Sequence, residues 1–127
     1  MADAGFPRRV RLLTARDYKS VFDDAPFRAS SQELLVLARR SDHPHARMGV
    51  VVSKKNCRLA TARNRFKRLV RESFRLNQNS LEGLDIIVLA RKGIGTHSNQ
   101  DITRLLTHSW NRILKKAAAT RSNPEIS

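Results

Sequence analysis

Phosphate-binding side chains are concentrated in residues 53–71, which hold eight Lys and Arg residues and no Asp or Glu. Opposite charges four residues apart stabilise a helix surface by about 0.2–0.5 kcal/mol, and like charges destabilise it by similar amounts. Here Lys67 precedes Arg71, and Arg71 precedes Arg75, at that spacing. A bound polyanion would relieve this repulsion, so the stretch favours nucleic acid binding over an ordinary solvated basic helix.

The four histidines could supply acid–base chemistry, but their spacing does not assemble a site. His43 and His45 flank Pro44, whereas His97 and His108 lie far along the chain and lack a convincing set of Cys or carboxylate partners for a metal. A ribonuclease can use two histidines and a lysine as acid, base and oxyanion stabiliser. A protein-only nuclease that depends on His43 or His97 therefore stays open as an alternative.

Two other patterns are poor candidates for chemistry. Gly93-Ile94-Gly95 has part of a dinucleotide-binding fingerprint, but Ser98 stands in place of the third glycine, and a tight turn is favoured. Cys57 lies in a basic loop without a resolving cysteine, so we interpret it as incidental. We predict neither a catalytic residue nor a metal site on this chain.

Tyr18 and Phe22 are one helical turn apart near the basic stretch. An aromatic pair at this spacing packs into a core in many proteins. Alternatively, the rings offer faces on which unpaired nucleotide bases stack, which contributes about 1–3 kcal/mol per base. The sequence leaves both interpretations open.

Composition indicates one folded domain with an anionic partner. The chain has 127 residues, of which 40% are hydrophobic, and its formal net charge is +14. We predict a single RNA-binding domain over residues 1–120 and a flexible tail over residues 121–127. No apolar run reaches the roughly 18 residues of a membrane span, no signal peptide is evident, and the lone Cys57 suits a reducing compartment. The predicted location is cytoplasmic.

Hydrophobic periodicity predicts the elements that position the basic stretch. Helices are expected over about 15–22, from about residue 61 to 77–79 and from about residue 99 onward, and strands over 33–38, 48–52 and 85–90. Thr14 and Asp17 form a variant capping box, and Gly49 indicates a bulge or a close approach of the backbone. The order α-β-β-α-β-α predicts an α+β fold with a single small mixed sheet and packed helices.

The basic stretch also resembles a known family. The run Val52-Ser53-Lys54-Lys55 and the later Arg-Asn-Arg-x-Lys-Arg-x-x-Arg pattern of residues 63–71 are similar to the bacterial ribonuclease P protein subunit. The resemblance extends to residues 14–22, to 88–92 and to the last helix with its tryptophan. It implies the fold shared with the second domain of ribosomal protein S5.

The resemblance implies a non-catalytic subunit of an RNA-based endoribonuclease that removes the 5′ leader of precursor tRNA. The expected partners are the catalytic RNA and precursor tRNA, with no membrane and no obligatory protein partner. The holoenzyme would require Mg²⁺ bound mainly by RNA, with none on the protein. By resemblance, the residues that face the catalytic RNA are Arg63, Asn64, Arg65, Lys67, Arg68 and Arg71. The leader would lie in a cleft between the first helix and the sheet, contacting Tyr18, Phe22, Ser53, Lys54, Lys55, Arg91 and Lys92.

One feature departs from the family pattern, and two other functions stay open. Family members often carry aromatic residues on the first strand that face the leader, where this chain offers Leu34 and Leu37. A ribosome-associated or general RNA-binding protein would carry the same charge pattern. DNA binding is a further alternative, although no helix-turn-helix partner is evident.

Overall fold

The structure, a computed structural model, describes residue 11 and residues 14–122, which form one small sheet covered by helices. In chain order the elements are α1 (Ala15–Asp23), β1 (Phe27–Ser30), β2 (Leu34–Arg40), β3 (Arg47–Val51), α2 (Ala60–Asn77), β4 (Leu84–Ala90), the 3-10 helix η3 (Ile94–Thr96) and α3 (Asn99–Ser122). The predicted α+β class and single mixed sheet are confirmed. The predicted order α-β-β-α-β-α was incomplete, because it lacked β1.

Strand β1 was missed because it is short and directly follows Pro26. Its burial alternates, with Phe27 and Ala29 buried and Arg28 and Ser30 exposed. Alternation over only four residues is weak evidence for a strand. At the other end of the chain, α3 reaches Ser122, so the helix includes the first two residues of the predicted tail, and residues 123–127 lie outside the described part.

The sheet has the strand order β1-β2-β4-β3. β2 pairs antiparallel with β1 and β4, and β3 pairs parallel with β4. Parallel neighbours need a long crossover connection, which α2 provides. The basic helix α2 therefore connects the adjacent parallel strands β3 and β4 along the chain.

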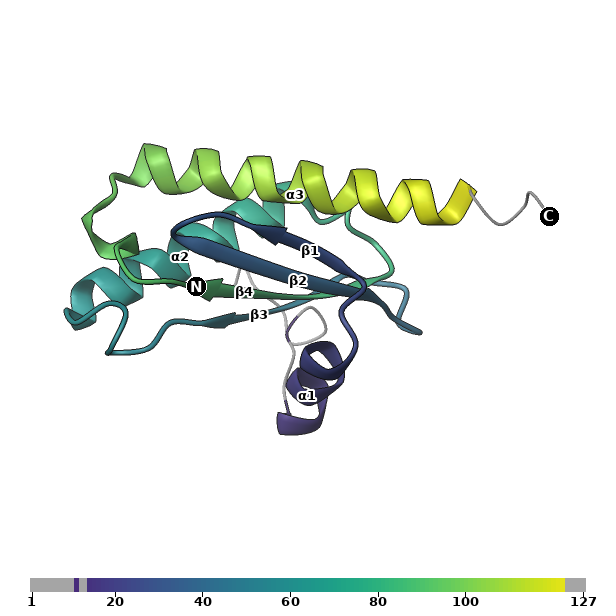
Figure 1. The fold of residues 1–127 in the computed structure, drawn as a ribbon, viewed down its shortest axis with the longest axis horizontal. Helices are drawn as coiled ribbons and strands as arrows, with labels where there is room; N and C mark the ends of the chain where they lie inside the picture. Colours follow the sequence, from purple (N-terminus) through teal and green to yellow (C-terminus); the bar gives the residue numbers. More distant parts are fainter. Residues whose placement is uncertain (1–10, 12–13, 123–127) are drawn as a thin grey trace.

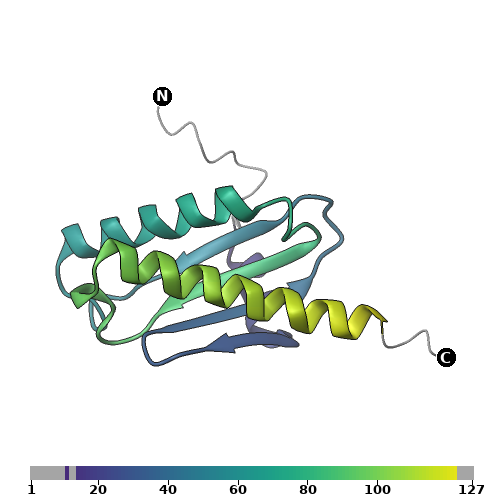
Figure 2. The ribbon, with the colours of Figure 1, turned by 90° about the horizontal axis from the view of Figure 1, so that it is seen from above.

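The fold has three layers, with α2 and α3 on one face of the sheet and α1 on the other (Figure 1). Seen from above, α2 and α3 lie side by side over the strands (Figure 2). Between them, the rings of Phe74 and Trp110 pack edge to face with their centroids 6.3 Å apart, and Trp110 Nε1 donates to Ser73 Oγ at 2.8 Å. This buried contact fixes the basic helix against α3.

Helix α1 begins at the predicted capping box. The Asp17 backbone N–H donates to Thr14 Oγ1 at 3.1 Å, and the Thr14 N–H donates to Asp17 Oδ2 at 3.2 Å. Asp17 also lies 3.7 Å from Arg47 Nη1, at the start of β3. The capping residue thus joins α1 to the sheet beneath it.

Arg47 joins β3 to β4 through a two-fold ion pair with Asp85. Its Nε and Nη2 atoms each donate to an Asp85 carboxylate oxygen at 2.9 Å. The hydrogen bond to Asp85 is the main reason that the pKa of Arg47 is raised above its ordinary value. Asp85 is buried, so this pairing compensates a charge that would otherwise be costly in the sheet.

Candidate RNA interface

We call the sheet face that packs against α1 the α1 face. Its centre is a small apolar cluster of Val21, Leu37 and Ile87. Three further apolar side chains of this face are only half-buried: Leu35, Val51 and Leu89. The register places these three on neighbouring strands β2, β3 and β4. They form a strip that runs across the strands beside α1.

The expectation that Leu34 and Leu37 face this surface was half wrong. Leu37 belongs to the α1 face, but Leu34 is buried in the core on the opposite face, with α2 and α3. Successive side chains of a strand point to opposite faces, so two residues three apart cannot share one. Leu35 occupies the place expected for Leu34.

The two predicted aromatic residues differ in their surroundings. Phe22 is 47% exposed, so the core-packing interpretation does not apply to it. Tyr18 is half-buried, and its ring lies so close to Gly49 that an added Cβ would be 2.5 Å from Tyr18 Oη. The close approach predicted at Gly49 is therefore made by the Tyr18 ring. Both aromatic side chains lie on α1, one packed on the sheet and one open to solvent.

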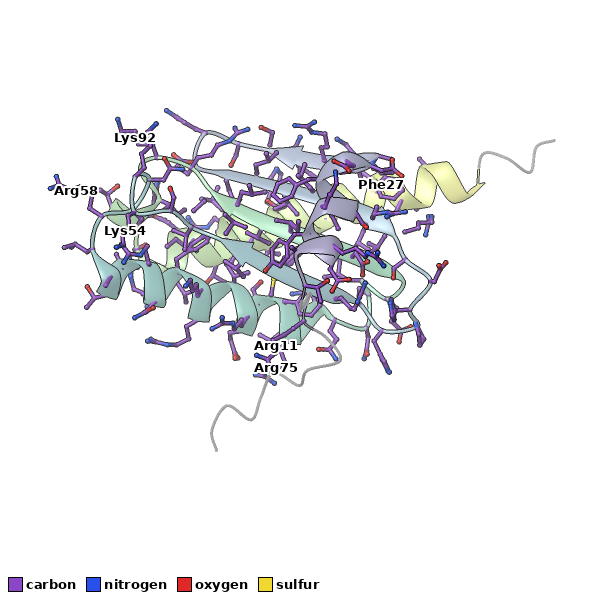
Figure 3. All side chains as sticks on the ribbon, turned by 90° about the horizontal axis from the view of Figure 1, so that it is seen from below. Arg11, Phe27, Lys54, Arg58, Arg75 and Lys92 are labelled. Carbon is purple, nitrogen blue, oxygen red and sulfur yellow. The ribbon has the colours of Figure 1, made fainter. Side chains whose placement is uncertain are left out.

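The predicted leader-binding cations meet at one end of the sheet. Asn56 Nδ2 donates to the Ala90 carbonyl at 3.0 Å, which ties the loop after β3 to the end of β4. Lys54 and Lys92, which Figure 3 shows at the same end of the molecule, are both exposed. Ser53 and Lys55 are exposed in the same loop.

Arg91 is held in place by the first hairpin. Its Nη1 donates to Ser30 Oγ at 3.0 Å and to the Ser31 carbonyl at 2.7 Å. Its own backbone N–H donates to the Glu33 carbonyl at 2.9 Å. The guanidinium is thus fixed beside β1, whereas Lys92 next to it is exposed.

The helix α2 carries the second predicted set of RNA-binding residues. Asn64, Arg68 and Arg71 are exposed on it, and Lys67 is half-buried. Phe66, Val70 and Phe74 are buried on its other side. Glu72 pairs with Arg75 at 2.6 Å rather than with Arg68, the partner its spacing also allowed.

Two arginines of this set bond to their own protein. Arg63 Nη1 donates to the carbonyls of Cys57 and Arg58 at 3.0 and 2.9 Å. Arg65 reaches the segment from η3 to the first residue of α3, where it donates to three acceptors: His97 O at 3.1 Å, Asn99 Oδ1 at 2.7 Å and Gly95 O at 3.3 Å. No sequence pattern indicates these contacts, because most of the acceptors are backbone carbonyls.

The histidines proposed for a protein nuclease line different pockets. His43 lines one with Ser20, Arg39 and Arg47, whereas His97 and His108 line another with Glu33, Asp101, Arg104 and Leu105. His97 Nε2 lies 3.3 Å from a Glu33 carboxylate oxygen, and the other ring nitrogen lies 3.9 Å from Asp101. His43 and His97 are therefore not brought together as an acid–base pair.

Across residue 11 and residues 14–122, no three His, Cys, Asp or Glu side chains are grouped so that they could hold a metal ion. Among the described helices, none is long and apolar enough to cross a membrane.

The chain is similar to proteins of one family. Residues 6–114 match the family model described as Ribonuclease P. The ribonuclease P protein component of Chromohalobacter salexigens is 53% identical over 115 residues, which cover 91% of this chain and 90% of that protein. The corresponding protein of Pseudomonas aeruginosa is 44% identical over 122 residues, covering 96% and 90%.

Solved structures give the same result. The RNase P protein of Staphylococcus aureus superposes with a TM-score of 0.74 and 26% identity, covering 80% of this chain and 93% of that one. The RNase P protein of Thermotoga maritima superposes with a TM-score of 0.67 and 31% identity, covering 77% and 92%.

Proposed function

The chain belongs to the ribonuclease P protein family and is a protein subunit of this tRNA-processing endoribonuclease, and from this premise we propose how it divides its surface between two RNAs. The exposed side of α2 binds the catalytic RNA. The α1 face binds the 5′ leader of precursor tRNA. Mg²⁺ is bound mainly by RNA, the compartment is the cytoplasm, and no further protein is obligatory.

The observation that carries this proposal is that the cations of α2 and the cations at the end of the sheet are carried by different elements. α2 lies on one side of the sheet, and the α1 face lies on the other. The loop from Ser53 to Leu59 leads from the end of β3 to the start of α2 and so connects them. Two RNAs can therefore be bound at once without competing for the same side chains.

The α1 face suits an unpaired strand. Phe22 offers an exposed ring for stacking, and the half-buried strip of Leu35, Val51 and Leu89 offers apolar contact for bases or sugars. The exposed Lys54, Lys55 and Lys92 at the end of the sheet supply charge for phosphates. The proposed leader contacts are Tyr18, Phe22, Ser53, Lys54, Lys55, Arg91 and Lys92. These groups contact ring faces, sugars and phosphates rather than the hydrogen-bonding edges of bases, so the preference for particular leader sequences is weak.

The α2 surface suits folded RNA. Asn64, Lys67, Arg68 and Arg71 form its contact surface, because a row of like charges on a rigid helix is matched by closely spaced phosphates. Arg63 and Arg65 act through position instead. Their bonds to the loop before α2 and to the connection before α3 set where the helix lies.

Precursor-tRNA cleavage at low Mg²⁺ tests the function, with catalytic RNA alone, protein alone and the two together. We expect stimulation only when both are present. Cutting by the protein alone would support a protein nuclease, and no stimulation in any mixture would favour a general RNA-binding protein.

Paired variants test the division of the surface. Lys54→Ala with Lys55→Ala is expected to weaken precursor tRNA binding but leave mature tRNA unchanged. Arg68→Ala with Arg71→Ala is expected to weaken assembly with the catalytic RNA. If the two double variants weakened precursor tRNA binding and assembly with the catalytic RNA to the same extent, the assignment of separate surfaces would be contradicted.

A further inference from the structure

Two guanidinium groups converge on one residue of the edge strand β1. Arg91, at the end of β4, donates from Nη1 to Ser30 Oγ, and Arg112 of α3 donates from Nη1 to the Ser30 carbonyl, both at 3.0 Å. Arg91 approaches from the α1 face, since Ser30 pairs with Leu35 on that face. Arg112 approaches from the helix on the other side of the sheet. The two positive charges thus meet at the edge of β1.

Two more cations extend this cluster along the same strand. Lys116, one turn after Arg112, donates to the Arg28 carbonyl. The Arg28 side chain itself is exposed and makes no hydrogen bond to another described residue. We call Arg28, Arg91, Arg112 and Lys116 the β1-edge cluster.

Among the residues that the structure describes, no carboxylate pairs with the three arginines of this cluster. Among the described residues, no Asp or Glu oxygen lies within 4 Å of a side-chain nitrogen of Arg28, Arg91 or Arg112. Glu33, in the adjacent turn, is instead 3.3 Å from His97. A guanidinium carries five N–H donors, so the bonds to Ser30 and Ser31 leave capacity for a phosphate.

The cluster continues the strip of the proposed leader site. In the order β1-β2-β4-β3, the strip starts at Val51 on β3, passes Leu89 and Leu35, and reaches Ser30 on β1. Neighbouring strands are about 4.8 Å apart, so the crossing is about 14 Å long. A strand that follows it arrives at the β1-edge cluster.

The position of α2 gives this path a direction. α2 directly follows the loop that carries Ser53, Lys54 and Lys55, on the β3 side of the path. If the catalytic RNA docks on α2, the leader nucleotides nearest the cleavage site enter on that side. Nucleotides farther from the cleavage site leave over β1.

We infer that the β1-edge cluster binds phosphates of the distal part of the leader. Arg28, Arg112 and Lys116 are then leader contacts in addition to those of the proposed function. This inference rests on the proposed function of the α1 face. It adds a second anchoring point for the same strand and predicts an affinity that depends on leader length.

The test is binding of fluorescent precursor tRNAs to the assembled holoenzyme, with leaders from about 2 to about 16 nucleotides, the range of single-strand site sizes. Arg28→Ala is the principal variant, because this side chain holds no part of the fold. Arg112→Gln and Lys116→Ala are the supporting variants. Lys115→Ala, an exposed cation on the same helix, is the matched control.

We expect Arg28→Ala and Arg112→Gln each to weaken the binding of long-leader precursors about three- to tenfold and to leave the binding of short-leader precursors unchanged. Lys115→Ala should bind all precursors as the unchanged protein does. The slope of log affinity against log salt should fall by about 0.7 per variant, on long leaders only. Equal losses at every leader length, or an equal loss with Lys115→Ala, would overturn the inference, as would no loss at all. If Lys54→Ala with Lys55→Ala also has no effect on any leader, the proposed function of the α1 face itself fails.

Discussion

The Arg65 side chain makes hydrogen bonds within the protein, although it belongs to the set that the family resemblance assigns to the catalytic RNA. Its three acceptors lie in η3, in the connection after it and at the first residue of α3, and the contact fixes the N-terminal part of α2 against that segment. Arg68, one turn later, is exposed. The same chemical group thus has two different surroundings in one helix.

Arg65→Ala and Arg68→Ala should separate these roles. We expect Arg65→Ala to lower the free energy of unfolding by about 1–3 kcal/mol, since two partly buried carbonyls lose a charged donor. Arg68→Ala should leave stability unchanged but flatten the salt slope of catalytic-RNA binding by about 0.9. Thermal unfolding and salt titration measure the two effects. A flattened slope with normal stability for Arg65→Ala would make it an RNA contact.

Gly49 is required because of one neighbouring ring. A Cβ there would lie 2.5–2.8 Å from three atoms of Tyr18, so Gly49→Ala must displace the ring. We expect a loss of about 1–3 kcal/mol, typical of overpacking, together with weaker binding of precursor tRNA. Chemical denaturation measures the stability change. In Gly49→Ala with Tyr18→Ala the overpacking penalty should vanish, and strictly additive losses would contradict the steric explanation.

At the scale of elements, the sequence was sufficient to predict the long helices and the apolar strands but not the edge strand β1. The periodicity of α2 and α3 and the capping box at Thr14 each predicted an element that the structure contains. β1 was missed, and with it the cations Arg28, Arg112 and Lys116, because their grouping depends on a tertiary contact between the first hairpin and the last helix. The inward role of Arg65 was missed for the same reason.

Arg47 joins β3 to β4 through its ion pair with Asp85, and it also lies 3.7 Å from Asp17 of α1. Arg47→Ala would leave the buried Asp85 carboxylate without its partner, and we expect a loss of about 3–5 kcal/mol in the free energy of unfolding. The matched control is Arg75→Ala, whose exposed pair with Glu72 should cost at most about 1 kcal/mol. Urea denaturation compares the two variants. Similar losses for both would show that burial of Asp85 does not set the cost.

At the scale of the whole molecule, the proposed function divides the cations of a chain with a net charge of +14 between two RNA-binding surfaces. If Lys67, Arg68 and Arg71 each neutralise one phosphate, log affinity for the catalytic RNA should fall with log salt at a slope of about −2.1 to −2.7. Filter binding over a range of KCl concentrations measures this slope. A slope near zero would mean that the charge of α2 makes no contribution to assembly.

The bonds from α3 to β1 also have a consequence for the protein before it meets RNA. An open edge strand offers its carbonyls to a strand of another chain, which is a common start of aggregation. Here Arg112 and Lys116 already occupy the outward carbonyls of Ser30 and Arg28. In the RNA-free protein these bonds therefore protect β1 from pairing with a strand of another copy, which favours the monomer over aggregates before RNA binds.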